Sequence, residues 1–249
     1  MKAYLVRVGI DQRSGDWNSP LNKVTNKFVY VPIPEDQDKG NKLQRQGYAE
    51  PFSQFKRPCS ELGKELFANL LERDAHLDPD FRYLTYGDQH NKAKQLNDAK
   101  LVEDDALVFY AGLKPIDSLP NETHDLIYAL IGLYILAGPR VKATHLPPKD
   151  WHKNAHTRRV PQDDDIVFFA KEIVSGRLEK CIDIGECIDG RYYLKQDLFD
   201  LWGGFEFPHK KEIPRLYLQV SGALPRFKNA AKFHDWFTTQ NTRLVQRNN

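Results

Sequence analysis

Residues 2–34, KAYLVRVGIDQRSGDWNSPLNKVTNKFVYVPIP, decide how the rest of the chain is organised. They contain two short apolar runs rich in β-forming residues, 3–8 and 28–33, and each run predicts a strand. A long polar loop separates the two runs, unlike the short connection of an ordinary hairpin. Long loops of this kind are usually functional or disordered. The strong strands on both sides and Trp17 within the loop indicate that this one is ordered.

A charged residue inside the first run, Arg7, indicates a polar pocket where the loop leaves the strand. A charge in a buried strand must be paired or must face a site, because an isolated buried charge is costly. The loop that follows holds Asp11, Trp17 and Ser19, which are candidates for that pocket. The alternative is a solvated loop in which Arg7 forms an ion pair with an aspartate. This stretch alone does not separate the two interpretations.

The composition is that of a globular protein, and it predicts no membrane-spanning segment. With 249 residues, 41% of them hydrophobic and 28% charged, the chain can form one large domain or two small ones. Its longest apolar run, 126–137, is shorter than the about 18 residues that a transmembrane helix needs. The three cysteines form no CxxC pair, and with no signal peptide they predict a cytoplasmic location. A net charge of +2 neither predicts nor excludes nucleic-acid binding, which depends on a local basic patch.

Carboxylates and histidines concentrate in residues 76–80, His-Leu-Asp-Pro-Asp, and in the segment that follows up to residue 90. The proline between Asp78 and Asp80 fixes its own backbone angle and favours an extended conformation for Asp78. Carboxylates in such a stiffened loop suit general acid–base catalysis or metal binding. The alternative, which the local sequence favours, is that the two aspartates cap the next turn and lie in solvent.

The other apolar segments predict an α+β fold. Helical spacing predicts a helix over 60–71 with Ser60 as N-cap, a short helix over 198–202, and a final amphipathic helix around 233–237. Runs of β-forming residues predict strands over 106–111, 126–136, 166–170, 178–184, 192–194 and 215–220. Gly132 inside the longest run predicts a bulge or a sharp bend, as the strands of a small barrel need.

The order of these strands resembles the barrels of PUA and ASCH domains. We therefore expect a mixed β core with a small PUA/ASCH-like barrel and peripheral helices. The chain is expected to be one domain over 1–249, which could divide into an N-terminal lobe, 1–100, and a β-barrel lobe, 101–249.

A second cluster of functional residue types occupies 151–159, WHKNAHTRR. Two histidines four residues apart would share one face of a helix, but no Glu lies between them, so the zinc-protease pattern is absent. A loop that contacts nucleic acid fits these types better, because basic groups hold phosphate, an indole stacks on a base and a histidine moves a proton. The residues concerned are Trp151, His152, Lys153, His156, Arg158 and Arg159. The alternative is an exposed basic loop, and the two interpretations are evenly balanced.

Three blocks of the chain resemble, in the right order, the third type of nucleotide modification associated domain. The blocks are residues 6–11 with 19–20 and 32–34, then 76–80 with 86–88, and then 104–112, 130–136, the loop with the two histidines and 165–170. The resemblance covers nearly the whole chain and implies a protein that acts on, or reads, a modified nucleobase in DNA, in phage and mobile-element modification systems. By matching position it implies roles for Arg7, Asp11, Ser19, Asp78, Asp80, His152 and His156. The two histidines are more widely spaced here than the resemblance implies.

The leading hypothesis is an enzyme of DNA base modification that works by acid–base chemistry on an unstacked base between the N-terminal loop and residues 78–80. The expected catalytic residues are Asp11, Asp78, Asp80, His152 and His156. The expected substrate-binding residues are Arg7, Trp17, Ser19, Trp151, Lys153, Arg158 and Arg159. No metal is assigned and no cofactor is identified, although the lack of a phosphate-cradling glycine loop argues against ATP. Expected partners are DNA with a modified base and other enzymes of a DNA-modification pathway.

Two alternatives belong to other classes of protein. The first is a non-catalytic PUA-like reader of modified bases, in which an aromatic cage from Trp17, Trp151 or a tyrosine would matter more than the carboxylates. The second is a metal-dependent nuclease that would hold Mg²⁺ with Asp11, Asp78, Asp80 and Asp88, although the chain lacks the (D/E)xK pairing expected after such a carboxylate.

Overall fold

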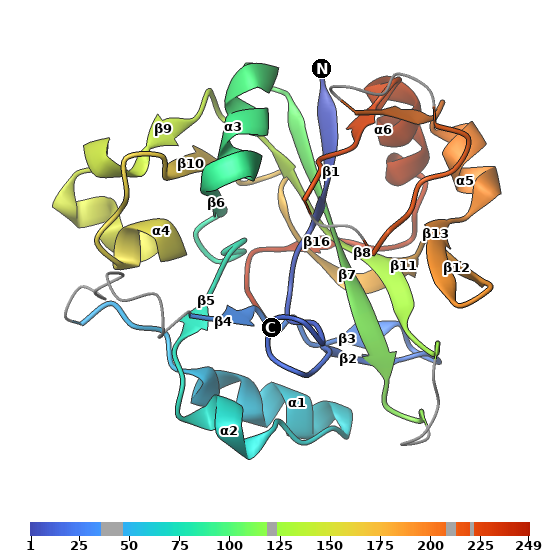
Figure 1. Ribbon diagram of the computed structural model, residues 1–249, viewed down its shortest axis with the longest axis horizontal. Coiled ribbons are helices and arrows are strands. Elements are labelled where there is room, and N and C mark those ends of the chain that lie inside the picture. Colours follow the sequence, from blue (N-terminus) through green and yellow to red (C-terminus); the bar gives the residue numbers. More distant parts are fainter. Residues whose placement is uncertain (36–46, 119–123, 208–212, 220–221) are drawn as a thin grey trace.

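One large mixed sheet runs through the centre of the computed structural model, which describes residues 1–35, 47–118, 124–207, 213–219 and 222–249 (Figure 1). Its strands follow the order β14 (Phe205–Glu206), β15 (Arg226–Phe227), β1 (Ala3–Arg7), β7 (Ala106–Pro115), β8 (Ile127–Ile135), β11 (Gly176–Asp183) and β16 (Leu244–Val245). The short strands β2 (Pro20–Asn22) and β3 (Lys27–Phe28) pair with each other, and β2 also pairs with β7. The protein is therefore α+β, as predicted.

The two central strands, β7 and β8, are apolar on both faces because both faces are covered. Along β7, Phe109 and Leu113 belong to one hydrophobic cluster, whereas Val108 and Tyr110 belong to the other. This alternation follows from the period of two of a β-strand, which sends successive side chains to opposite faces. Helices α5 and α6 lie on one side of these strands, and α3, α4, β6 and β10 lie on the other (Figure 1).

A bulge next to Gly132 confirms the prediction for this glycine. Phe109 pairs with Gly132 but Tyr110 pairs with Leu130, so the register of β7 and β8 shifts by one residue. A Cβ atom on Gly132 would lie 2.7 Å from the ring atom Cζ of Phe81, which leaves no room for a side chain.

Strand β1 pairs with β7 in parallel, from Ala3 opposite Ala106 to Arg7 opposite Tyr110. Parallel neighbours require a long crossover connection, and here it carries much of the first hundred residues. Within it, β4 (Ile33–Pro34) pairs with β5 (Ala75–His76), and β6 (Thr85–Asp88) joins β10 (Ile166–Phe169) and β9 (Val141–Lys142) in a small sheet. The strands β12 (Gly185–Ile188) and β13 (Arg191–Leu194) form a separate hairpin.

The helices are short and lie around the sheets. They are α1 (Lys56–Leu62), α2 (Ala68–Leu71), α3 (His90–Ala99), α4 (Ala155–Arg158), α5 (Gln196–Leu201) and α6 (Ala230–Thr238), with 3₁₀ turns η1 (Phe52–Phe55), η2 (Ala143–His145) and η3 (Pro148–Lys153). In the part of the chain that the structure describes, no helix is long and apolar enough to cross a membrane.

Three expectations about the elements are wrong in detail. The helix predicted over 60–71 is broken, because Gly63 adopts a left-handed conformation (φ 94°) and ends α1, whose residue Ser60 is internal rather than an N-cap. The run 28–33 divides into β3 and β4, with Pro32, which has no N–H to donate, between them. Residues 215–219 make only an isolated bridge, Tyr193 with Tyr217, and residue 220 lies outside the described residues. The PUA/ASCH-like barrel is not borne out either, since no pairing between described strands closes the main sheet.

Candidate active site

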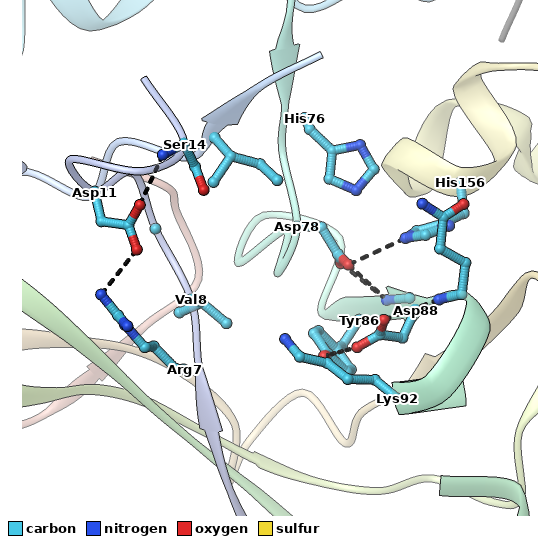
Figure 2. A pocket seen from close by; sticks show the side chains of 14 residues that line it. Arg7, Val8, Asp11, Ser14, His76, Asp78, Tyr86, Asp88, Lys92 and His156 are labelled. Carbon is cyan, nitrogen blue, oxygen red and sulfur yellow. Dashed lines mark hydrogen bonds and ion pairs between the residues drawn. The ribbon is translucent and has the colours of Figure 1, made fainter. Parts of the chain in front are cut away.

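A cavity of about 270 Å³ lies between the N-terminal loop, the segment around Asp78 and the start of α3 (Figure 2). Its polar walls come from segments far apart in the sequence. The lining residues are Arg7, Val8, Gly9, Asp11, Ser14, Ile33, His76, Asp78, Tyr86, Gly87, Asp88, Gln89, Lys92 and His156.

On one wall, His76 is positioned by strand pairing and by a buried carboxylate. It ends β5, where it pairs with Ile33 of β4. Its Nδ1 lies 2.8 Å from Oε1 of Glu35. Burial alone would raise the pKa of Glu35, but His76, together with Arg159 and His156, outweighs burial and lowers this pKa to about 2. Glu35 is therefore a carboxylate that fixes the orientation of the imidazole.

Asp78 is held by two donors that aim its carboxylate into the cavity. The backbone N–H of Gly87 donates to both carboxylate oxygens, at 2.9 and 3.1 Å, and Nδ2 of Asn154 donates to one of them at 3.0 Å. Gly87 has to be a glycine for this approach, because a Cβ there would lie 2.5 Å from Cδ2 of His156.

His156 is buried opposite Asp78 and is held by a second carboxylate. Its Nδ1 lies 2.7 Å from Oδ1 of Asp165, and its Nε2 lies 3.6 Å from Oδ2 of Asp78. Burial alone would lower the pKa of His156, but the hydrogen bonds with the two aspartates outweigh burial and raise this pKa to about 9. The pKa of Asp165, which burial alone would raise, falls to about 2 because His156 and Arg159 stabilise the carboxylate.

The N-terminal loop forms the facing wall through an ion pair. Nη2 of Arg7 lies 2.8 Å from Oδ2 of Asp11, whose other oxygen accepts hydrogen bonds from the backbone N–H groups of Arg13 and Ser14. Asp11 therefore closes the first turn of the loop and also neutralises Arg7. The sequence allowed an ion pair of Arg7 with an aspartate as one interpretation of this loop, and that aspartate is Asp11.

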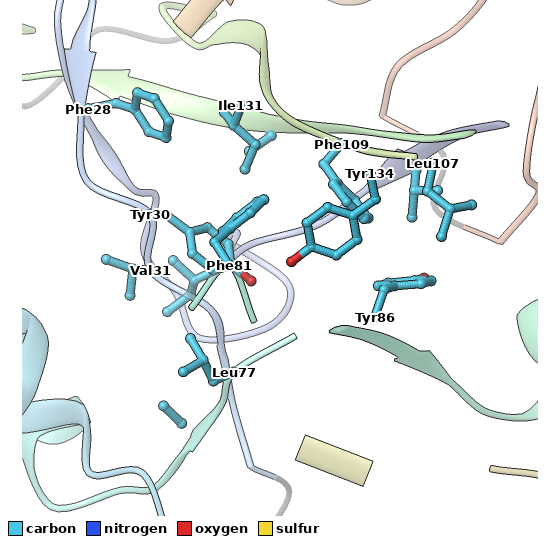
Figure 3. Packing of buried hydrophobic residues seen from close by; sticks show 14 of the residues in the cluster. Phe28, Tyr30, Val31, Leu77, Phe81, Tyr86, Leu107, Phe109, Ile131 and Tyr134 are labelled. Atoms are coloured by element: carbon cyan, nitrogen blue, oxygen red, sulfur yellow. The ribbon is translucent and has the colours of Figure 1, made fainter. Parts of the chain in front are cut away.

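Tyr86 links this cavity to the hydrophobic core. Its ring packs on Phe109 at 5.3 Å between centroids, within an aromatic group that also includes Phe81 and Tyr134 (Figure 3). Its hydroxyl donates to Oδ2 of Asp88 at 2.5 Å at the edge of the cavity. The polar wall is thus anchored on a rigid core, as a preorganised site requires.

The structure brings together four of the residues predicted from sequence. Arg7, Asp11, Asp78 and His156 all line the same cavity. Asp80 is fully buried and faces away from it, with Oδ2 2.5 Å from Nη2 of Arg158.

The two arginines predicted to hold phosphate are buried as well. Arg158 pairs with Asp80, and Arg159 pairs with Asp165 at 2.7 Å. Because a buried, paired guanidinium does not reach a DNA backbone, these arginines organise the carboxylates behind the site. Ser19 is also buried, and its hydroxyl hydrogen-bonds the backbone of Val31.

The remaining predicted residues lie elsewhere. Trp17 is in the core, 3% exposed. Trp151 donates to the carbonyl of Leu146, His152 packs edge-on against Tyr83, and Lys153 pairs with Asp150 at 2.7 Å. The two histidines do not share a helix face, because Asn154 between them is extended and caps α4.

Sequence reasoning missed several residues of the site. They are Glu35, Gly87, Gln89, Lys92, Asn154 and Asp165. Asp88 was named only as a magnesium ligand, and His76 only as part of the segment 76–80. Two signals were present, since His76 precedes Asp78 in the same short segment and Asp165 ends the acidic run before β10. Nothing in the sequence around Glu35 indicated that it belongs to the site.

These features define a class of protein: an α+β protein with a cavity of carboxylates and imidazoles beside the first strand of its main sheet. The family model of nucleotide modification associated domain 3 matches residues 2–237, so the chain belongs to that family, as the resemblance predicted. The family thereby connects the chain with nucleotide modification. Neither a search of curated proteins nor a search of solved structures found a match.

Proposed function

We propose that this protein is an enzyme that modifies a nucleobase in DNA, with the cavity around Asp78 as its active site. The observation that carries the proposal is the convergence of Asp11, Asp78 and His156 on one cavity from three distant segments, in a chain of a nucleotide-modification family. Burying several charged groups together costs stability, and clusters of titratable groups with perturbed pKa values are concentrated at functional sites, which supports the proposal.

The size of the cavity favours a single base as the substrate. About 270 Å³ is close to the lower end of ligand pockets, roughly 300–1,000 Å³, and suits one small ring system. A base inside a duplex cannot enter such a pocket, so the substrate is an unstacked or single-stranded nucleotide. Lys92, whose ammonium is directed into the same space in Figure 2, gives the cavity a cation that attracts a phosphate or a base carbonyl.

The chemistry that these side chains support is proton transfer at the base. His156 and Asp78 face each other on one wall, and Asp11 lies on the wall with Arg7, so a bound base would have acid–base groups on two sides. Asp80 and His152, which point elsewhere, take no part in this proposal.

A reader of modified bases is supported less well. Such a reader needs an exposed aromatic cage, whereas Trp17 packs in the core and Trp151 does not line the cavity. Tyr86 does line the cavity but is only 2% exposed. For a magnesium nuclease, Asp11, Asp78 and Asp88 line the cavity, but Asp80, the fourth expected ligand, is buried against Arg158.

The test is mass spectrometry of nucleosides digested from the DNA of cells with and without this gene. The variant to compare is Asp78→Asn, with Asp98→Asn on the exposed face of α3 as a matched control. We expect a nucleoside of changed mass with the wild type and D98N but not with D78N. A profile that does not depend on the gene would overturn the proposal in favour of a reader, which binding to modified against plain DNA would then identify.

A further inference from the structure

We infer that His76, Asp78 and His156 form a binding site for one divalent transition-metal ion of the zinc or ferrous-iron class. Each of the three offers one ligand atom, and these atoms lie within 4.8 Å of one another at the wall of the cavity. In Figure 2 both imidazoles face the carboxylate of Asp78. His76 and Asp78 are two residues apart in the segment 76–80, and the fold of α4 brings His156 to them.

The distance between two of the ligand atoms is close to the distance that a shared ion requires. Nε2 of His156 and Oδ2 of Asp78 are 3.6 Å apart. Two ligands each about 2.1 Å from a metal are about 3.4 Å apart at a tetrahedral angle and about 3.0 Å apart at an octahedral one. Shifts of a few tenths of an ångström would therefore place this pair on one ion.

Both imidazoles carry the outer partner that metal-binding histidines usually have. Nδ1 of His76 lies 2.8 Å from Glu35, and Nδ1 of His156 lies 2.7 Å from Asp165. A carboxylate on Nδ1 fixes the tautomer and leaves Nε2 as the ligand nitrogen. The rings meet edge to face, with centroids 4.9 Å apart and planes at 80°, as two ligands that approach one centre from different directions would.

The charges of the residues around the three ligands also favour a bound cation. Metal binding requires both imidazoles in the neutral form. In that form the carboxylates of Glu35, Asp78 and Asp165 and the guanidinium of Arg159 sum to a net charge of −2. A divalent cation neutralises this charge in a buried place where a net charge is costly.

The donor set selects the class of ion. Imidazole nitrogen is a ligand for zinc, iron and copper, whereas magnesium and calcium take oxygen ligands. Two histidines and one carboxylate are the protein ligands of catalytic zinc sites and of ferrous oxygenases, and both leave positions open for water or substrate. An ion here would polarise a base carbonyl or activate a water molecule in the cavity. His156 and Asp78 would then act as its ligands, and Asp11 would be the group left to transfer a proton.

A measurement of bound metal tests this inference without any substrate. Its result is therefore independent of the proposed base modification. The folded wild-type protein, freed of tags and stripped with a chelator, is titrated with Zn²⁺, with Fe²⁺ under anaerobic conditions, with Co²⁺ and with Mg²⁺. Metal bound after desalting is counted by elemental mass spectrometry, and the Co²⁺ absorption spectrum reports the coordination. We expect about one Zn²⁺ or Fe²⁺ per chain, a higher Tm with the ion, and no retained Mg²⁺. The ion that binds more tightly, Zn²⁺ or Fe²⁺, is the ion that the site prefers.

The variants His76→Gln, Asp78→Asn and His156→Gln test the ligands. His90→Gln is the matched control, because His90 is exposed, pairs with Asp164 and does not line the cavity. Each ligand variant should lose at least 10-fold in affinity, and H90Q should bind like the wild type. A folded wild type that retains no Zn²⁺ or Fe²⁺, or a folded ligand variant that binds as tightly as the wild type, overturns the inference. The wild-type measurement alone can refute the inference, so the test remains valid even if a variant folds poorly.

Discussion

Replacing Asp80 by Asn distinguishes a structural carboxylate from a catalytic one. Sequence alone made Asp80 a catalytic candidate, but the structure buries it completely. Its Oδ2 lies 2.5 Å from Nη2 of Arg158, and its Oδ1 accepts hydrogen bonds from the backbone of Arg82 and from Asn248. The substitution keeps the shape of the side chain but places an amide, or a neutral oxygen, against a buried guanidinium.

The expected loss in the free energy of unfolding depends on which partners Arg158 keeps after the substitution. Breaking a buried ion pair by neutralising one partner costs roughly 3–5 kcal/mol. Glu50 lies 3.5 Å from the same guanidinium nitrogen and compensates part of the charge, so we expect about 3 kcal/mol, the lower end of that range. For a chain of this length each kcal/mol lowers Tm by about 2–4 °C, which gives a fall of about 6–12 °C.

The assay is urea unfolding followed by tryptophan fluorescence, together with the nucleoside measurement at a temperature where the variant is folded. The double variant D80N/R158M should lose less stability than the two single variants together, with a coupling of about 1 kcal/mol or more, because it leaves no unpaired charge. The control is Asp98→Asn, which removes an exposed pair with Lys94 and should change stability by less than about 0.5 kcal/mol. A D80N protein with wild-type stability and no modifying activity would refute this reasoning and return Asp80 to the active site.

Three further predictions concern packing, hydrogen bonding and thiol reactivity. Gly132→Ala should lower the free energy of unfolding by about 1–3 kcal/mol, because its Cβ would overlap the ring of Phe81, whereas Gly138→Ala, with open space around it, should be neutral by thermal denaturation. Ser19→Ala should cost about 1–3 kcal/mol in urea unfolding, because it leaves a buried backbone N–H unpaired, and a loss of DNA affinity at unchanged stability would contradict this role. Of the three thiols, only the exposed Cys187 should react with a thiol reagent in the native protein at pH 8, and all three should react in denaturant. Burial raises the pKa of the other two to about 12; they are Cys59 and Cys181.

The N-terminal loop shows how far local reasoning reaches at the site. A charge within an apolar strand predicted a polar pocket beside Arg7, and a cavity lies there. The alternative interpretation, an ion pair of Arg7 with an aspartate, is also present, since Asp11 both lines the cavity and neutralises Arg7. The two interpretations were not exclusive, because one carboxylate has enough oxygen atoms for both contacts.

The sequence by itself determined the strands of the core and their main irregularity. Residues 3–8, 106–111, 126–136 and 166–170 are apolar runs of β-forming residues, and each is a strand in the structure with bounds shifted by a few residues. Gly132 marked the bulge for a reason that is local as well, since a glycine within a strand indicates a place where another group approaches closely. Secondary structure and burial follow from the spacing of apolar residues within a short segment, and this spacing can be read directly from the sequence.

Only the tertiary structure decided which polar residues meet. Asp78 and Asp80 are two residues apart, yet one accepts from Gly87 in the cavity and the other pairs with Arg158 in the interior. His156 enters the site and His152 does not, because an extended Asn154 turns the chain between them. The partners of these groups lie about 10 to 80 residues away along the chain, and the choice among them depends on strand pairing and on the cost of a buried unpaired charge. Neither strand pairing nor the cost of a buried charge appears as a repeating pattern in a short stretch of sequence. The site therefore forms only when the whole chain has folded.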